Sequence, residues 1–235
     1  MSRSRKPEKS PKAYKNLDFV NSEEARSVRI LCEYLEPKAR FQRLGVNRSV
    51  IFFGSARTKS RTPYYNGAAD LAEKLARWTK KTHKADQRFH IVSGGGPGIM
   101  QAAHEGAARV DAKLSIGLNI SLLFEQHGNR FVSKERALEF HYFFMRKFWF
   151  ANLASALVAF PGGYGTLDEM FEFLTLAQCG KAQRMPIVLY GREYWNEIIN
   201  FEALARRGLI SPHDLKLFRF ADTPEEAFSA LTKKL

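Results

Sequence analysis

The chain has 235 residues, of which 45% are hydrophobic and 26% are charged, and this composition is typical of a globular protein with one sizeable core. No apolar run approaches the ~20 residues that a membrane-spanning helix needs, and the basic N-terminus lacks the apolar stretch of a secretory signal. The two cysteines, Cys32 and Cys179, are too far apart in sequence to suggest a disulfide framework or a paired metal motif. We therefore expect a cytoplasmic protein with no membrane partner.

The formal net charge is +13, and part of it is concentrated at the N-terminus. Residues 1–15 hold six basic residues and one acid, Glu8, so this segment carries +5. We predict a disordered basic tail over 1–15, a helical extension over 16–48 and one nucleotide-binding domain over 49–235. A basic tail can contact nucleic acid. Aromatic residues do not interleave with these charges before Tyr14, so a nucleic-acid partner is not expected.

The first helix is expected to begin at Ser22-Glu23-Glu24, where a Ser cap precedes acids in the first turn. It is expected to run to Glu36, because Pro37 ends or redirects a helix. A second short amphipathic piece is expected over 39–44.

From residue 49 onward, short apolar runs alternate with segments of helical periodicity. We expect strands at 49–53, 90–92, 114–118, 138–143, 156–160, 186–190 and 218–220. We expect helices at 64–81, 97–109, 145–153, 166–179, 194–206 and 225–234, and a loop at 119–134. Strands that end at glycines and alternate with helices predict the α/β class, with a single Rossmann-like, doubly wound parallel sheet flanked by helices.

Two glycine-rich segments follow predicted strands, at the edge where such sheets bind ligands. The first is Gly94-Gly95-Gly96-Pro97-Gly98, called here the first glycine loop. Four glycines before a helix N-terminus allow close approach of an anion, and we predict a phosphate or ribose site there; the alternative is a plain tight turn. Ile99 stands where GxGxxG requires a glycine, and GxxxxGK[ST] is absent, so an NAD site or a P-loop is disfavoured.

The second glycine loop is Pro161-Gly162-Gly163-Tyr164-Gly165-Thr166. Thr166 followed by Glu169 matches a capping box, which would give Glu169 a purely structural role. The same position also places a carboxylate at the mouth of a phosphate site. A carboxylate that faces a ribose can stabilise an oxocarbenium-like transition state or activate water.

Arg146 and Lys147 interrupt an otherwise apolar and aromatic stretch, residues 143–150. Cations so near a core need partners. The spacing leaves two interpretations open: a structural ion pair with an acid such as Glu139, or a catalytic role. The six histidines show no metal-ligand spacing, and no metal site is expected.

These segments together resemble the Lonely Guy (LOG) family, whose members are cytokinin riboside 5′-monophosphate phosphoribohydrolases often labelled lysine decarboxylases. The resemblance covers about residues 49–190, and the family signature PGGxGTxxE is matched at every fixed position from Pro161 to Glu169. The extra N-terminal helix resembles the longer subgroup of the family. Family members usually have a His shortly before the arginine, whereas Phe144 and Met145 precede Arg146 here.

The resemblance implies a role for each matched residue. Arg146 and Glu169 correspond to the catalytic pair. The substrate-binding residues implied are Ser55, Gly94, Gly95, Gly96, Gly98, Met145, Lys147, Gly162, Gly163, Tyr164, Gly165 and Thr166. It also implies a homo-oligomer, at least a dimer, with residues near Arg146 close to the interface.

The leading hypothesis is hydrolysis of the N-glycosidic bond of a nucleoside 5′-monophosphate, AMP or an N6-substituted AMP, to free base and ribose 5-phosphate, without a metal or redox cofactor. The alternative is a non-catalytic carrier of a nucleotide or phosphorylated cofactor. An NAD-dependent oxidoreductase and a nucleic-acid module are weaker hypotheses. A pyridoxal-dependent decarboxylase is disfavoured, because no particular lysine stands out as a Schiff base.

Overall fold

The computed structural model of the chain describes residues 10–121, 129–182 and 184–235. It contains a seven-stranded sheet in the order β4-β3-β2-β1-β5-β6-β7, in which every pair of neighbours is parallel. The strands are β1 (Arg48–Phe53), β2 (Phe89–Ser93), β3 (Ser115–Ile120), β4 (Ala137–Phe140), β5 (Ala154–Ala159), β6 (Ile187–Tyr190) and β7 (Arg219–Ala221). The expected doubly wound sheet is confirmed. Residues 1–9 of the tail expected over 1–15, and segment 122–128 of the expected loop, lie outside the described residues. Within the expected tail, Ala13–Lys15 forms a short 3-10 helix.

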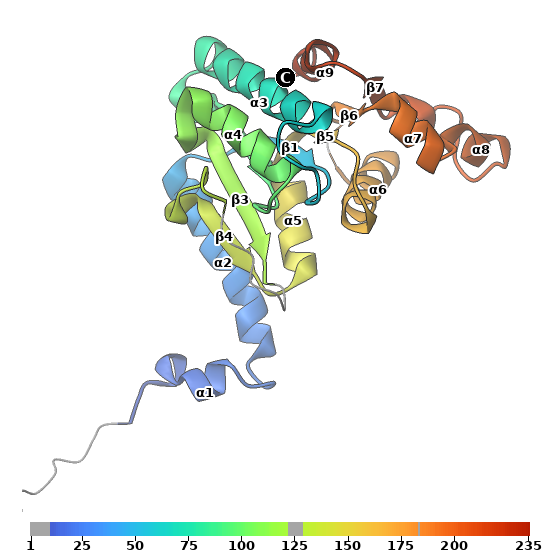
Figure 1. Ribbon diagram of the computed structural model, residues 1–235. Helices are drawn as coiled ribbons and strands as arrows, with labels where there is room; N and C mark the ends of the chain where they lie inside the picture. The colour runs from blue at the N-terminus through green and yellow to red at the C-terminus, as the bar shows by residue number, and fades with distance from the viewer. Residues whose placement is uncertain (1–9, 122–128, 183) are drawn as a thin grey trace, which may run out of the picture.

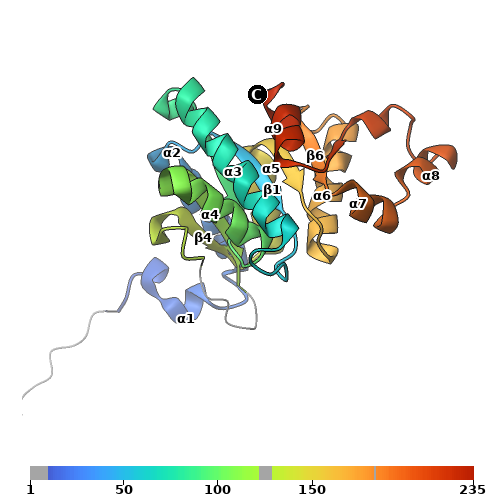
Figure 2. The same cartoon turned by 45° about the horizontal axis from the view of Figure 1, so that its top comes forward.

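Helices cover both faces of the sheet (Figures 1 and 2). One face carries α3 (Pro63–Thr82), α4 (Ile99–Asp111) and α9 (Pro224–Thr232). The other carries α2 (Arg26–Leu44), α5 (Phe143–Leu153) and α6 (Tyr164–Gln178), with α7 (Arg192–Ile198) and α8 (Phe201–Arg206) beyond them. The short α1 (Leu17–Val20) extends away from this body in Figure 1.

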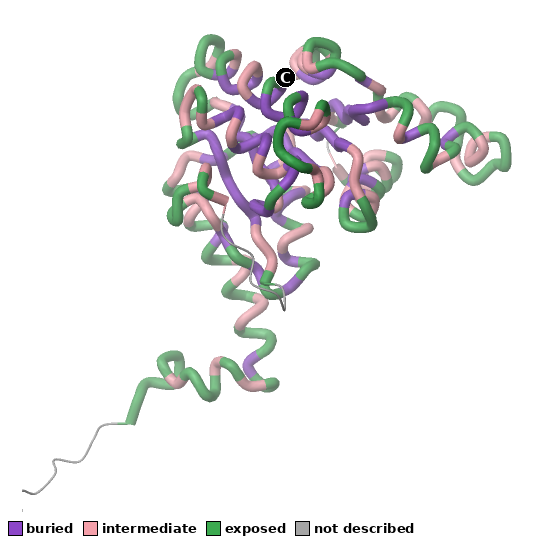
Figure 3. The backbone as a smooth tube through the Cα atoms, in the orientation of Figure 1, coloured by how far each residue is buried: buried purple, intermediate pink, exposed green. Residues whose placement is uncertain are grey.

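The central strands are apolar along their length because they are covered on both sides. In β1, every residue after Arg48 is buried, and Figure 3 shows the buried backbone concentrated in the sheet and the inner sides of the helices. Phe52 packs with Phe160 toward one layer of helices, and Phe53 packs with Phe150 toward the other. This two-sided core fixes the height at which the strands end, and therefore the position of the loops that follow them.

The N-terminal helix differs from the prediction at both ends. Helix α2 begins at Arg26, not at Ser22, and it continues without a break through Pro37 to Leu44. Proline removes the hydrogen bond that would reach the carbonyl four residues earlier, which belongs to Glu33. That carbonyl instead accepts a hydrogen bond from Nε1 of Trp149, at 2.9 Å. The tertiary partner satisfies the freed carbonyl, so the proline is tolerated inside the helix.

The helix expected over 194–206 is two helices, α7 and α8. Asn200 separates them, and its side chain accepts a hydrogen bond from the backbone N–H of Ala203 at 2.9 Å. An Asn that caps a new helix competes with continuation of the preceding one. The break follows from this local cap.

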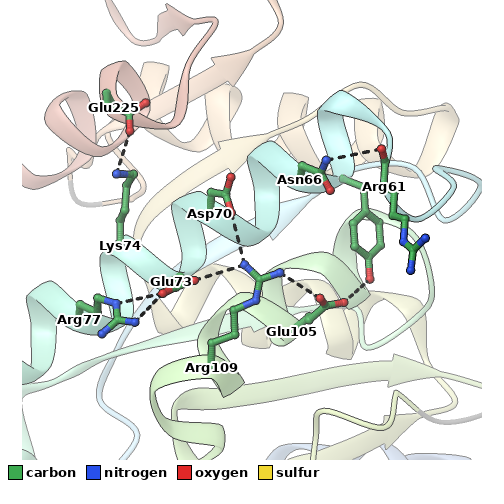
Figure 4. A network of polar contacts seen from close by, with 10 residues as sticks. Arg61, Asn66, Asp70, Glu73, Lys74, Arg77, Glu105, Arg109 and Glu225 are labelled. Atoms are coloured by element: carbon green, nitrogen blue, oxygen red, sulfur yellow. Dashed lines mark hydrogen bonds and ion pairs between the residues drawn. The ribbon is translucent and has the colours of Figure 1, made fainter.

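A polar network on the outer surface joins α3 to α4 (Figure 4). Arg109 of α4 pairs with Asp70 and Glu73 of α3, at 3.3 Å each, and with Glu105 on its own helix at 3.0 Å. Tyr65 of α3 donates to Glu105 at 2.7 Å. Because the first glycine loop leads directly into α4, this network helps to fix the helix that presents the loop.

Candidate active site

The ends of three strands meet at the carboxyl edge of the sheet. Strand β1 lies between β2 and β5, where the strand order reverses direction, and this reversal is where doubly wound sheets bind ligands. Ser55, just after β1, donates its backbone N–H to the carbonyl of Pro161 at 3.0 Å. Its own carbonyl accepts the N–H of Ile99 at 3.1 Å. Ser55 therefore connects the two glycine loops, which are far apart in the sequence.

The first glycine loop is packed too tightly for side chains at two of its positions. Gly95 and Gly98 have φ values of +71° and +67°, which favour glycine. A Cβ at Gly98 would lie 2.2 Å from the carbonyl oxygen of Ser55, and one at Gly95 would lie 1.6 Å from Oδ1 of Asn119. Gly96 is buried in the same turn. The glycines are thus required by close backbone approach and not only by a single turn.

The second glycine loop leads into α6, where N–H groups of the first turn lack helical partners. A Cβ at Gly162 would lie 2.1 Å from Oγ1 of the buried Thr166, whereas Gly163 and Gly165 face open space. Tyr164 is 93% exposed. The exposed start of this helix leaves its N–H groups accessible to an anionic ligand.

The capping box predicted from Thr166 and Glu169 is not formed at this helix. Helix α6 begins at Tyr164 with Gly163 in the cap position and no side-chain cap, so Thr166 is already inside the first turn. Glu169 then lies in the second turn, where it cannot reach the cap. The glycine-rich start lets the helix form earlier than the Thr-x-x-Glu pattern indicates, and Glu169 is left free for another contact.

That contact is Arg146. Nη2 of Arg146 donates to Oε1 of Glu169 at 2.9 Å, and the two side chains are only 11% and 13% exposed. The guanidinium lies over the rings of Phe143 and Phe150, at 5.0 and 5.7 Å from their centroids. A Cβ at Gly94 would lie 3.8 Å from Nη1 of Arg146. Arg146 therefore borders the first glycine loop, and Glu169 lies one turn beyond the second.

The expected structural alternative for Arg146, a pair with Glu139, is not formed. Glu139 lies on β4 and accepts a hydrogen bond from the hydroxyl of Ser121 at 2.8 Å. The acid that Arg146 meets comes from α6, beyond the central strands. Sequence spacing alone could not reveal this partner, because the contact depends on how two helices pack on the same face.

Burial sets the electrostatics of the pair. Loss of hydration raises the pKa of the Glu169 carboxyl to about 7, while the nearby Arg146 opposes that rise. Burial lowers the pKa of Arg146, and Glu169 opposes that shift in turn. A carboxyl group that titrates near neutral pH can change its protonation state under ordinary conditions, as acid–base chemistry requires.

Met145 and Lys147, the other two residues of α5 that match the family motif, contact residues other than Glu169. Lys147 points to a different side of the helix, where its Nζ meets Asp168 at 2.9 Å and Glu172 at 3.3 Å. Met145 is buried in the core. The structure thus brings Arg146, Glu169, Ser55 and the two loops together, and it places Lys147 in an ion-paired link between α5 and α6.

A buried polar chain beneath the first glycine loop was missed by the sequence reasoning. The N–H of Gly95 donates to Oγ of Ser93 at 3.1 Å, and Nε2 of His104 lies 3.3 Å from the same oxygen. Nε2 also lies 3.1 Å from the carbonyl of Ile116, and Asn129 reaches Nδ1 at 3.0 Å. Burial lowers the pKa of His104 to about 4, so a neutral ring with its proton on Nε2 fits these contacts.

A second missed residue is Asn119, at the carboxyl end of β3. Its Oδ1 packs on Gly95 and is buried without a hydrogen-bond partner among the described residues. The available signal for Asn119 was an amide side chain near the carboxyl end of a strand, where doubly wound sheets bind ligands. For His104, the sequence offered only a histidine within a helix.

Two further observations concern metals and membranes. Within residues 10–121, 129–182 and 184–235, no group of three or more His, Cys, Asp or Glu side chains is arranged to hold a metal ion. None of the helices in this described part of the chain combines the length and apolar character needed to cross a membrane.

The curated proteins that the chain resembles share one activity name. The chain is 30% identical to the cytokinin riboside 5′-monophosphate phosphoribohydrolase LOG7 of Arabidopsis thaliana, over 85% of this chain and 90% of that relative. It is 31% identical to LOG3 of the same plant, which bears the same activity name, over 84% and 83% of the two chains. A family model described as "possible lysine decarboxylase" matches residues 100–231.

Comparison with solved structures supports the fold. The molybdenum cofactor binding protein of Rippkaea orientalis matches with a TM-score of 0.52 and 17% identity, over 77% of this chain and 94% of that one. A structural-genomics target matches with the same TM-score and 20% identity, over 77% and 96%. Because the family model spans more than half of the chain and the curated relatives align over most of both sequences, the protein belongs to the Lonely Guy (LOG) family.

Proposed function

We propose that this protein hydrolyses the N-glycosidic bond of a nucleoside 5′-monophosphate, AMP or an N6-substituted AMP, to free base and ribose 5-phosphate. The observation that carries the proposal is the buried Arg146–Glu169 pair beside two glycine loops at the carboxyl edge of the sheet. The names of its relatives, which are phosphoribohydrolases of cytokinin riboside 5′-monophosphates, support the same reaction class.

In this proposal the phosphate binds at the start of α6, where free N–H groups and the helix dipole favour an anion. The first glycine loop and Ser55 border the ribose, because these backbones can approach a ligand closely. The binding residues proposed are Ser55, Gly94, Gly95, Gly96, Gly98, Met145, Lys147, Gly162, Gly163, Tyr164, Gly165 and Thr166. Among them, Met145 acts from within the core and Lys147 through its link to α6.

Glu169 is the proposed catalytic carboxylate. It stabilises the positive charge that develops at the anomeric carbon, or it accepts a proton from the attacking water. Water supplies the hydroxyl of ribose 5-phosphate, and the base leaves with a proton. Arg146 holds Glu169 in place through Nη2, and its Nη1 lies toward Gly94 of the first glycine loop, on the side proposed for the ribose.

The test is product analysis with the purified chain. AMP, N6-prenyl AMP and CMP are incubated separately, and free base and ribose 5-phosphate are quantified by chromatography. We expect base release from at least one adenine nucleotide and little from CMP. Nucleotide binding in calorimetry without base release from any of the three would overturn the hydrolase proposal and favour a carrier.

We also propose that the protein acts in the cytoplasm as a homo-oligomer. The two cysteines are both unpaired, which suits a reducing compartment. Six apolar side chains on the packed helices α2 and α5 are 40% or more exposed: Val28, Leu31, Leu35, Phe143, Phe144 and Phe148. We name this set the α2–α5 apolar surface. Exposed apolar side chains on adjoining helices favour an interface.

A further inference from the structure

We propose that the N-terminal helix α2 positions the catalytic pair, and that Glu33 is the positioning residue through which it acts on Arg146. The inference rests on the proposed function, since that function gives Arg146 its role. It adds a residue from the N-terminal extension to a site that is otherwise built from the sheet domain.

The first contact is made by the side chain of Glu33. Its Oε1 accepts the backbone N–H of His141 at 2.7 Å, and its Oε2 accepts that of Tyr142 at 3.2 Å. Tyr142 is the cap residue of α5 and provides no side-chain cap itself. N–H groups at a helix start need an acceptor, and a carboxylate there is favoured by the helix dipole. Glu33 thus binds, from another helix, the two N–H groups that immediately precede the first residue of α5.

The second contact is made by the backbone of the same residue. The carbonyl of Glu33, left free by Pro37, accepts Nε1 of Trp149 at 2.9 Å. Trp149 is buried on α5 and packs against Tyr34 and Phe41 of α2, with ring centroids 5.9 and 5.2 Å away. Through these two contacts Glu33 holds α5 both before its first residue and in its second turn.

Arg146 lies between these two attachment points. It is four residues beyond Tyr142 and three before Trp149, so the contacts with Glu33 restrict both rotation of α5 and its movement along its axis. The guanidinium must stay within reach of Oε1 of Glu169, now 2.9 Å away. A displacement of ~1 Å in a catalytic group can cost on the order of 100-fold in rate.

The charges around Glu169 provide a readout of this positioning. Arg146 of α5 contacts Glu169 directly, at 2.9 Å. Three further charges act on it from nearby: Lys147 of α5 and its two partners on α6, Asp168 and Glu172. Arg146 and Lys147 lower the pKa of Glu169, while the two acids raise it. A small displacement of α5 lengthens the Arg146–Glu169 contact while the carboxyl stays buried. It therefore weakens the influences that lower this pKa and keeps the burial that raises it, so the pKa of Glu169 should increase.

The test compares Glu33→Ala with Glu36→Ala in the full chain. Glu36 lies on the same helix, is exposed and bonds Arg40 of α2, so its replacement removes an equal charge without touching α5. We expect Glu33→Ala to lower kcat roughly tenfold or more with a small change in KM, and to move the acidic limb of the pH profile upward. Glu33→Gln, which retains one acceptor oxygen, should recover part of kcat, and Glu36→Ala should match the parent.

Two measurements without turnover separate this inference from the proposed function. Carbon-13 NMR titration reports the pKa of Glu169, and hydrogen exchange reports the protection of α5. Glu33→Ala should raise the pKa of Glu169 and lower the hydrogen-exchange protection of α5. If that variant fails to fold, Trp149→Phe removes the indole donor together with part of the buried ring, and it should change both readouts by less and in the same directions. Unchanged exchange and an unchanged Glu169 pKa in these variants would overturn the inference, whereas an inactive parent would overturn only the hydrolase proposal.

Discussion

Glu169 combines two opposing influences that define the chemistry of the site. Burial disfavours its ionised form, and the guanidinium at 2.9 Å favours it. The balance raises the pKa to about 7, above the ordinary value of 4.5. The Glu169 carboxyl is therefore mostly protonated below pH 7 and mostly ionised above it. A glutamate with the ordinary pKa of 4.5 would already be mostly ionised between pH 5 and pH 7.

This shift predicts the pH dependence of base release. The proposed role needs the carboxylate, so kcat/KM should rise with pH and reach half its maximum near 7 rather than near 4.5. In Arg146→Gln the activity should fall, and the limb should move to higher pH, because the cation that lowers the Glu169 pKa is gone. The substrate phosphate titrates near 6, but equally for both proteins. An acidic limb at the same pH in the parent and in Arg146→Gln would contradict the proposed effect of Arg146 on the Glu169 pKa.

At the scale of elements, the glycine loops differ in what each position tolerates. Gly98→Ala would place a Cβ 2.2 Å from a backbone oxygen at a φ of +67°, and we expect a loss of about 2–4 kcal/mol in the free energy of unfolding. Gly163→Ala meets open space and should remain within about 0.5 kcal/mol of the parent. Urea unfolding measures both. Equal midpoints for the two variants would show that the close approach of the first loop to Ser55 is not tight.

The strands were predictable from the sequence, because fully buried parallel strands appear as short apolar runs that end at glycines. The continuation of α2 through Pro37 was not, because the donor that satisfies the freed carbonyl is Trp149, more than one hundred residues away. The start of α6 was misjudged for a local reason: the Thr166–Glu169 pattern matched a cap, but Tyr164 and Gly165 already form helix.

The same distinction holds for the candidate site. Both glycine loops could be located from the sequence, since glycine clusters after strands have a direct physical meaning. Residue spacing alone could not predict the pairing of Arg146 with Glu169, because it depends on the packing of α5 against α6; the family resemblance was what brought these two residues together. The contacts of Glu33 were also hidden, because they join residues more than one hundred positions apart. Those of Ser93 and His104 were hidden because they depend on how α4 packs against β2 and β3.

At the scale of the whole molecule, the N-terminal extension has two roles in this account. One side of α2 packs on α5, and the other contributes to the α2–α5 apolar surface. If this surface mediates self-association, its disruption would expose the helix that carries Arg146. Assembly and the integrity of the site would then be linked through α5.

This view predicts the effect of charges on the surface. Leu31 and Leu35 are 53% and 51% exposed, and their joint replacement by glutamate should reduce the molar mass in light scattering to that of one chain, 26.8 kDa. Leu209→Glu, at a comparably exposed apolar residue after α8, should leave the assembly intact. A parent protein that is already monomeric at micromolar concentration would contradict the proposed interface.

The role of Glu169 is tested most directly by the rate of base release from AMP or N6-prenyl AMP, measured for the parent and for Glu169→Gln. Glu197→Gln, the same change at an exposed position on α7, serves as the matched control. We expect release by the parent and the control, and a rate lower by about 100-fold or more in Glu169→Gln, in keeping with the contribution of a catalytic acid–base group. Turnover by Glu169→Gln at the parent rate would contradict the assignment of Glu169 as the catalytic carboxylate.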